Sequence, residues 1–239
     1  MKTKLLTYQN PKTIKGIKLG YLTFILHLAP NTLNSYGKNL CPMATKGCIR
    51  GCLNTAGMGG IYKTVQDSRK KKSDYFISDR TNFLNDLYED IKIAIKIAEN
   101  KKLIPAFRLN GTSDIQWENI IIKDNKNIFE LFPDQMFYDY TKIVNRFDKK
   151  LPSNYNLTFS YSLEEDYYKG NVNELTKKVL NMGYNVAVIF YKNIPETFLG
   201  YTVINGDETD LRFIDKGIIV GLNAKGRAQT DKTGFVVRL

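Results

Sequence analysis

The sequence predicts an α/β fold in which a mostly parallel sheet, built from about six βα units, forms a partial TIM-like barrel. An open, doubly wound sheet is the alternative. Short apolar segments rich in β-branched and aromatic residues recur along the chain, and helical or polar segments separate them. Polar side chains follow the end of each apolar segment. Strands joined by such crossovers pair in parallel, with helices packed outside the sheet.

The first half of the chain contains two of these strands. An uninterrupted apolar run predicts the first at Leu19 to Pro30, LGYLTFILHLAP. A helix is expected from about Ser78 to Asn100, because apolar residues recur there at steps of three and four. A second strand is expected at Leu103 to Gly111, and a short helix around Ile128 to Leu131.

The second half continues the same alternation. Gly183 is expected to end the helix predicted at Asn173 to Met182, because glycine often follows the last residue of a helix. The predicted elements are a strand at Gln135 to Lys142, a strand at Tyr155 to Ser162, a helix at Asn173 to Met182, and strands at Asn185 to Lys192 and Gly217 to Leu222. There is no sequence repeat and no linker rich in Pro, Gly or Ser, so residues 1–239 are expected to form a single domain.

The composition favours a folded, basic protein. Hydrophobic residues make up 43% of the chain, and 35 Lys and Arg against 24 Asp and Glu give a net charge of +11. This excess favours phosphate-bearing partners, so nucleic acid is a candidate partner beside a small-molecule cofactor or substrate; an ordinary solvated surface is the alternative. The chain has neither a signal-peptide pattern nor an apolar run of about 20 residues. We expect no membrane partner and a cytoplasmic location.

All three cysteines, Cys41, Cys48 and Cys52, lie in one segment, LCPMATKGCIRGCLNTAGMGG, at residues 40–60 after the first core strand. Clustered cysteines in a reducing compartment more often bind metal than form disulfides. The nearby Lys46 and Arg50 favour thiolates, which zinc and iron–sulfur clusters select. The segment therefore predicts a metal or cluster site; a redox-reactive site and inert thiols are the alternatives.

The identity of the metal depends on the fourth ligand. Structural zinc takes four protein ligands, so His27, the only histidine, or a carboxylate would have to join the cysteines. His27 could instead be a hydrogen-bonded core residue. Three cysteines on a four-iron cluster leave one iron open for a substrate or cofactor, which is an enzymatic arrangement.

Polar residues at the predicted strand ends are the candidates for binding a cofactor or substrate, because α/β sheets and barrels bind ligands at the carboxyl ends of their strands. Taken singly, each could be ordinary polar surface. They are Arg108, Asn110, Ser113, Asp114, Asp139, Lys142, Ser160 and Lys225. Two further groups have both a binding and a structural interpretation. Asp207, Glu208 and Asp210 could form a cation site or an acidic turn. The run RKKKSD could contact phosphate or could be a solvated run before a helix.

The cysteine segment also carries a resemblance. A three-cysteine loop directly after the first strand of a six-strand βα chain resembles the radical S-adenosylmethionine (radical SAM) fold. The chain as a whole more closely resembles a family of uncharacterised phage-encoded proteins that carry a similar loop and are distantly radical-SAM-like. The segments that carry this second resemblance are LGYLTFILHLAP, CPMATKGCIRGCLNTAGMGG, FRLNGTSDIQWE, FYDYTK, LTFSYS and IIVGLNAKG.

The radical SAM resemblance implies that the cysteines hold a 4Fe-4S cluster whose open iron chelates the amino and carboxylate groups of S-adenosylmethionine. It also implies that the loop at 110–114 lies beside the amino-acid portion of that cofactor. The usual radical-enzyme motif has three and then two residues between its cysteines, with an aromatic before the last. Here the gaps are six and three residues, and Gly51 stands at the aromatic position.

Two hypotheses from different classes follow. The first is an iron–sulfur enzyme of radical type, whose substrate the sequence does not name. The second is a zinc-stabilised, basic protein that binds nucleic acid. A two-histidine replication initiator is excluded because the chain has one histidine. Neither a zinc deaminase motif nor a Walker A sequence is present.

Overall fold

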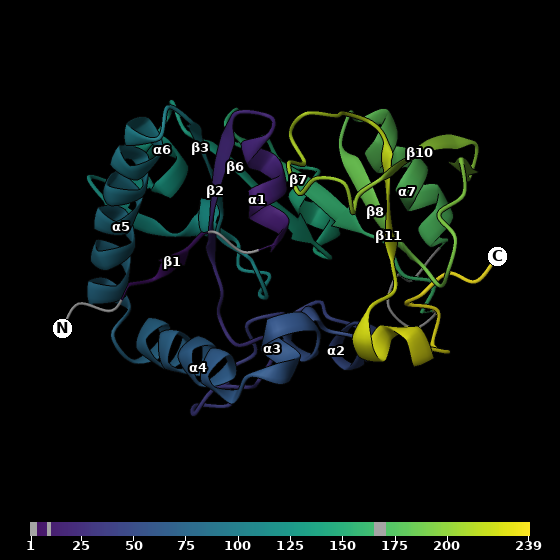
Figure 1. The fold of residues 1–239 in the computed structure, drawn as a ribbon, viewed down its shortest axis with the longest axis horizontal. Helices are drawn as coiled ribbons and strands as arrows, with labels where there is room; N and C mark the ends of the chain where they lie inside the picture. The colour runs from purple at the N-terminus through teal and green to yellow at the C-terminus, as the bar shows by residue number, and fades with distance from the viewer. Residues whose placement is uncertain (1–3, 9–10, 165–170) are drawn as a thin grey trace.

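A computed structural model describes residues 4–8, 11–164 and 171–239 of the protein. A nine-stranded sheet forms its centre (Figure 1). In spatial order the strands are β1 (Leu6–Thr7), β2 (Tyr21–Leu26), β3 (Ile104–Arg108), β6 (Met136–Thr141), β7 (Tyr155–Ser160), β8 (Asn185–Phe190), β11 (Ile219–Asn223), β10 (Tyr201–Asn205) and β9 (Thr197–Phe198). A separate hairpin pairs β4 (Ile121–Lys123) with β5 (Lys126–Asn127).

The sheet confirms the predicted α/β class with mostly parallel strands. All neighbouring pairs from β2 to β10 are parallel, and only the edge strands β1 and β9 pair antiparallel. The six predicted strands are present and lie side by side in chain order. In the described ranges β1 and β9 bond to no further strand, so the sheet does not close into a barrel.

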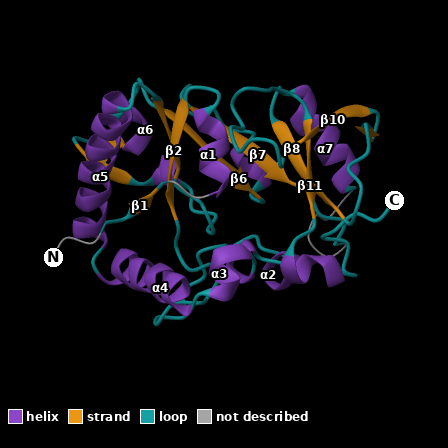
Figure 2. Cartoon of the chain, viewed as in Figure 1, coloured by secondary structure: helices purple, strands orange, loops and turns teal. Residues whose placement is uncertain are grey.

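Three predicted helices cover one face of the sheet: α5 (Arg80–Asn100), α6 (Ile128–Leu131) and α7 (Val172–Asn181) (Figure 2). The N-terminus of α5 is fixed by Asp79, whose side chain accepts a hydrogen bond from the Asn82 backbone N–H. A capping box between Asn127 and Glu130 starts α6. Such caps satisfy N–H groups that have no partner inside the helix.

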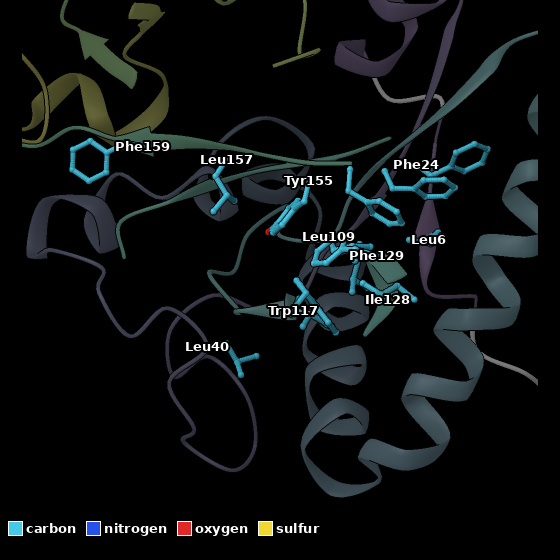
Figure 3. Close-up of a cluster of buried hydrophobic side chains, with 14 of the residues drawn as sticks. Leu6, Phe24, Leu40, Leu109, Trp117, Ile128, Phe129, Tyr155, Leu157 and Phe159 are labelled. Atoms are coloured by element: carbon cyan, nitrogen blue, oxygen red, sulfur yellow. The ribbon is translucent and has the colours of Figure 1, made fainter. Parts of the chain in front are cut away.

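Alternate strand residues face these helices and form the main core (Figure 3). Phe107 on β3 stacks between Phe24 on β2 and Phe137 on β6, with ring centroids 5.7 and 5.2 Å away. Phe129 of α6 packs edge-on against Phe137. This apolar layer fixes the register of the parallel strands, since a slip by one residue would expose it.

The opposite face of the sheet is more polar. It carries Arg108, Tyr140 and Ser160, which alternate with core residues along β3, β6 and β7. Part of it is covered by α1 (Pro11–Ile17), which packs on β2. Phe213, from the loop after β10, packs against Tyr138 of β6. The chemistry of the sheet is therefore concentrated on this second face.

The cysteine segment is folded into short helices rather than one loop. It contains α2 (Lys46–Arg50), the 3₁₀ turn η1 (Leu53–Thr55) and α3 (Gly57–Ile61), followed by α4 (Lys63–Ser78). These elements lie in a row along one end of the sheet (Figure 1). The sequence did not predict α4, which contains RKKKSD. Lys72 and Ser73 of that run are buried and bond to the backbone of Leu5 and Ala29, so this part is not a solvated run.

Three more 3₁₀ turns complete the described elements: η2 (Trp117–Asn119), η3 (Val144–Arg146) and η4 (Gly226–Thr230). The last of these follows β11 and contacts α2. Among the described residues, none of the helices has the length and apolar composition that crossing a membrane requires.

Candidate functional site

A pocket of about 200 Å³ lies at the carboxyl ends of the parallel strands, between the sheet and the cysteine segment. Strand residues such as Arg108, Tyr140 and Ser160 line it from the sheet. The cysteine segment lines it from the other side, and Ala228 and Phe235 line it from the chain that follows β11. The pocket thus occupies the position at which α/β sheets commonly bind ligands.

Cys41, Cys48 and Cys52 all line this pocket. Cys48 lies in α2, and Cys52 is the N-terminal cap of η1. Two of the sulfurs accept backbone hydrogen bonds, from Asn31 N–H to Cys41 Sγ at 3.4 Å and from Asn54 N–H to Cys52 Sγ at 3.5 Å. The local backbone therefore orients these two thiols.

Burial keeps the three thiols protonated in the absence of a metal. It raises the pKa of Cys41 to about 12 and that of Cys48 to about 11, and it also raises the pKa of Cys52. Cys48 and Cys52 further raise the pKa of Cys41 through charge repulsion, and the nearby Lys142 opposes the shift at Cys48. A metal that binds these groups would have to displace their protons.

The thiols do not form a ready site for a single ion. In the part of the chain that the structure describes, no three His, Cys, Asp or Glu side chains stand close enough together to hold one metal ion. His27 does not line the pocket with the cysteines. Its Nδ1 lies 3.4 Å from Thr7 Oγ1, and burial lowers its pKa to about 3, so the ring is neutral.

Six of the eight predicted ligand-binding residues line the same pocket: Arg108, Ser113, Asp114, Lys142, Ser160 and Lys225. Arg108 is only 7% exposed. Its Nη1 donates to Asp210 at 3.0 Å, and its guanidinium lies 4.7 Å from the centroid of the Tyr140 ring. Arg108 is therefore fixed in place by two neighbours.

The loops after β3 and β6 bind each other through Asp114. Its Oδ2 accepts the backbone N–H of Lys142 at 2.8 Å, and its Oδ1 accepts Arg146 Nη1 at 3.2 Å. Burial raises the pKa of Asp114 above its usual value, and these donors and the positive charges of Arg146 and Lys142 oppose that shift. The contacts hold Asp114 at the edge of the pocket with little freedom to move.

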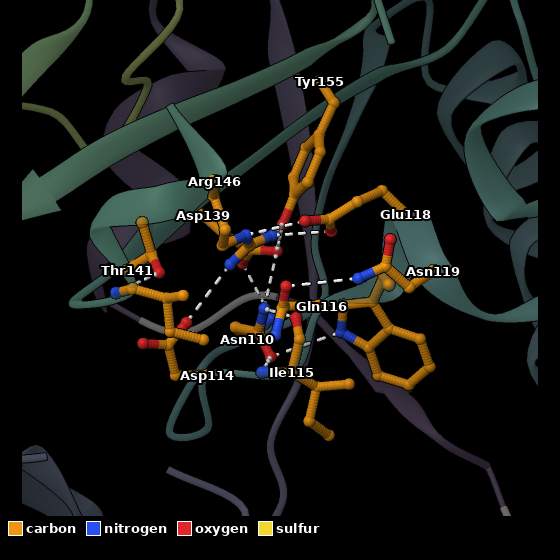
Figure 4. Close-up of polar contacts among 12 residues, drawn as sticks. Asn110, Asp114, Ile115, Gln116, Glu118, Asn119, Asp139, Thr141, Arg146 and Tyr155 are labelled. Carbon is orange, nitrogen blue, oxygen red and sulfur yellow. Dashed lines mark hydrogen bonds and ion pairs between the residues drawn. The ribbon is translucent and has the colours of Figure 1, made fainter. Parts of the chain in front are cut away.

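Asn110 and Asp139 were also predicted to bind a ligand, but they lie behind the pocket, in a buried polar network (Figure 4). Asp139 Oδ1 accepts the Asn110 backbone N–H at 2.7 Å, and Asp139 Oδ2 accepts the Tyr155 hydroxyl at 3.0 Å. Arg146 joins the network by donating to both carboxylate oxygens of Glu118 at 2.8 Å. Asn110 and Asp139 therefore hold the loops of the site in place and do not line the pocket.

The acidic residues after β10, Asp207, Glu208 and Asp210, do not share one role. Asp207 lines the pocket and pairs with Lys225, whereas Asp210 pairs with Arg108. Asp207, Glu208 and Asp210 do not form a described three-carboxylate cation site. Residues 206–208 form a turn, which agrees with the structural interpretation of this stretch.

The wall formed by residues 226–237 was not predicted, because this stretch has no motif. Gly47 of α2 and Gly51, which caps the C-terminus of that helix, let it approach closely. A Cβ added at Gly47 would lie 2.5 Å from Phe235 Cβ, and one added at Gly51 would lie 3.1 Å from Ala228 Cβ. The four-residue spacing of these glycines places both on one face of α2, which is the signal that could have indicated the contact.

A family model described as gene product 88 matches residues 2–239. The match is consistent with the phage-type family that the sequence motifs indicated. No curated protein matches the chain, and no solved structure matches it either. The family description names no cofactor, reaction or partner.

Proposed function

The chain belongs to the gene product 88 family, and we propose that it binds an iron–sulfur cluster through Cys41, Cys48 and Cys52 and acts as a radical-SAM-like enzyme. The observation that carries this proposal is that the only three cysteines of the chain line one pocket at the carboxyl ends of a parallel sheet. Inert thiols would have no need to line one pocket at the position where α/β sheets commonly bind ligands.

The chemistry of the three sulfurs fits a cluster. The N–H groups of Asn31 and Asn54 point at Cys41 Sγ and Cys52 Sγ, and hydrogen bonds to ligating sulfur are one means by which proteins tune iron–sulfur clusters. The cation of Lys142 lies near Cys48 and favours its thiolate. In a four-iron cluster the three thiolates bind different irons, so they need not converge on one point as the ligands of a single ion must.

The sheet supports the radical-SAM-like part of the proposal. Six parallel strands follow one another in chain order from β2 to β11, as they do in the wall of a barrel, so we interpret them as a partial TIM-like barrel. A cluster with an open iron would supply one-electron cleavage of S-adenosylmethionine. The chain's own polar groups at 113–114 would then orient that cofactor, and the buried walls would keep water away from it.

Zinc bound by the cysteines and His27 is the competing assignment. The position of His27 outside the pocket lining does not favour it. The proposed enzyme would work in the cytoplasm of a host cell, where thiols stay reduced. The positive charge remains a reason to test nucleic-acid binding separately, with a salt series.

Purification without oxygen tests the proposal. We expect brown protein that contains iron and acid-labile sulfide and absorbs in the visible range. If the open iron is free to bind a cofactor, added S-adenosylmethionine should change the electron paramagnetic resonance spectrum of the reduced cluster. Colourless protein with stoichiometric zinc would contradict the cluster assignment.

Cysteine variants locate the cluster. Cys41→Ala, Cys48→Ala and Cys52→Ala should each lose most of the iron and sulfide, while His27→Ala should retain both. A triple Cys→Ala protein that keeps its metal would show that the ligands lie elsewhere. Loss of metal in His27→Ala would instead support the zinc assignment.

A further inference from the structure

Lys142 differs from the other charged side chains that line the pocket. Three ion pairs neutralise those others: Arg108–Asp210, Asp114–Arg146 and Lys225–Asp207. Lys142 makes no such pair with any residue that the structure describes. It is nevertheless 4% exposed, and lysines are rarely buried without an acidic partner.

The contacts of Lys142 leave part of its bonding capacity unused. Its Nζ donates to the Ser160 carbonyl at 3.0 Å and lies 5.3 Å from the centroid of the Phe235 ring. A lysine ammonium has three donors, so one carbonyl leaves two without a hydrogen-bond acceptor in the described residues. A buried charge in this state is costly unless a ligand supplies the missing acceptors.

The carboxylates nearest to Lys142 in the described residues do not pair with it. The carboxylates of Asp114 and Glu164 act on Lys142 from a distance, but neither forms an ion pair with it. No carboxylate among the described residues therefore balances this cation through a direct ion pair.

Apolar side chains of β8, β11 and the C-terminal segment form one wall of the pocket, next to the polar Asn223, Asp207 and Lys225. Five side chains form this wall: Ala187, Ile189, Leu222, Ala228 and Phe235. Lys142 stands where this wall meets the polar loops, because its ammonium contacts Ser160 on one side and the Phe235 ring on the other. A ligand that satisfied both parts would carry a negative group and an apolar body.

We propose that the pocket binds a small organic anion whose carboxylate or phosphate pairs with Lys142 Nζ and whose apolar body packs against Phe235, Ile189 and Leu222. The inference rests on the proposed function in that it names the substrate class of the same pocket. It does not require the cluster to be present, because Lys142 and the apolar wall belong to the protein itself.

Three probes of similar size test the inference: benzoate, phenyl phosphate and the neutral benzyl alcohol. Binding is measured by calorimetry and by the shift in melting temperature, on metal-free and on cluster-loaded protein. We expect at least one anion to bind and to raise the melting temperature, and benzyl alcohol to bind more weakly. Removing a charged hydrogen-bond partner with Lys142→Met should weaken anion binding roughly ten- to a hundredfold.

Matched variants separate recognition from general charge. Lys225→Met removes a lysine from the same pocket, but one that Asp207 already neutralises, so it should change the Kd by less than about threefold. Lys142→Gln keeps a donor for the Ser160 carbonyl and serves if Lys142→Met does not fold. Lys142→Arg should retain measurable anion binding.

Three results would overturn the inference: no binding of either anion, equal binding of benzyl alcohol, or undiminished anion binding in both Lys142→Met and Lys142→Gln. Loss of iron with unchanged anion binding in these variants would also overturn it, because Lys142 would then serve the cysteines. Iron and sulfide analysis of the same samples separates the two proposals. A loaded cluster without anion binding contradicts only this inference, and anion binding without iron contradicts only the proposed function.

Discussion

The backbone N–H of Gly47 donates a 2.8 Å hydrogen bond to the carboxylate of Glu164, a residue 117 positions further along the chain. The bond joins the helix that carries Cys48 to the loop after β7. On its other side the same helix packs against Thr233 and Phe235. Gly47 therefore belongs to a crowded junction of three segments that meet beside the pocket.

Gly47→Ala should destabilise the protein and open the pocket. The added methyl would overlap Thr233 Oγ1 and Phe235 Cβ, and overpacking of this kind costs about 1–3 kcal/mol. Urea unfolding should show a lower midpoint, together with faster loss of any bound iron. Gly16→Ala is the control, since its methyl would meet neighbours at 3.6 Å and should be neutral or slightly stabilising. Equal midpoints for the two variants would contradict the close packing at Gly47.

Arg146→Met should be among the most destabilising single changes near the site. Arg146 is almost fully buried and pairs with Asp114 and Glu118, so its loss leaves two carboxylates without their cation. Breaking a buried pair in this way costs about 3–5 kcal/mol. Lys178→Met, which removes an exposed pair with Asp148, should cost less than about 1 kcal/mol. The free energies of unfolding of the two variants, measured side by side, check this difference.

Asp139 should make stability fall as the pH rises. Burial raises its pKa from 3.8 to about 7 in the folded protein, so between these values the folded state binds more protons than the unfolded state. The contribution of Asp139 is fully present below about pH 4 and is lost as the pH rises through about 7. Asp139→Asn should reduce this slope in unfolding measurements over the same range. An unchanged slope would show that Asp139 is not the titrating group.

The cysteines of the metal-free protein should react slowly with iodoacetamide at neutral pH. Burial raises the pKa of Cys41 to about 12 and of Cys48 to about 11, and only the thiolate is a good nucleophile. The alkylation rate, followed by mass spectrometry, should increase steeply with pH. Protein unfolded in urea provides the reference rate. A cysteine that reacts at that reference rate in the folded protein would contradict its burial.

Six of the strands could be predicted because their apolar runs are clearly bounded, as at Tyr21–Leu26 and Asn185–Phe190. The sequence did not predict β1, β4, β5, β9 and β10. The helix α4 could not, because its inward face includes Lys72 and Ser73, whose polar groups bond to backbone far along the chain. A pattern of apolar residues does not detect a face that is buried through hydrogen bonds. Tertiary contacts decided the conformation of this segment.

The candidate site could be predicted only in part, because tertiary contacts also decide which side chains reach the pocket. Asp139 lies inside β6 and is fully buried in the network behind the pocket, whereas Tyr140 and Thr141 at the carboxyl end of the same strand line the pocket. Phe235 could not have been assigned, because nothing near it in the sequence marks the contact with α2. Its role depends on where the chain after β11 crosses the sheet.

The contact between Gly47 and Thr233 also bears on the order of folding. It joins positions separated by most of the chain, and closing so long a loop is entropically unfavourable until the intervening strands have paired. The wall formed by the C-terminal segment is therefore expected to close late, after the parallel strands have assembled. Until then the three thiols are more open to solvent than in the finished fold, where they are half-buried, so a metal or cluster donor would have its widest access before this wall closes.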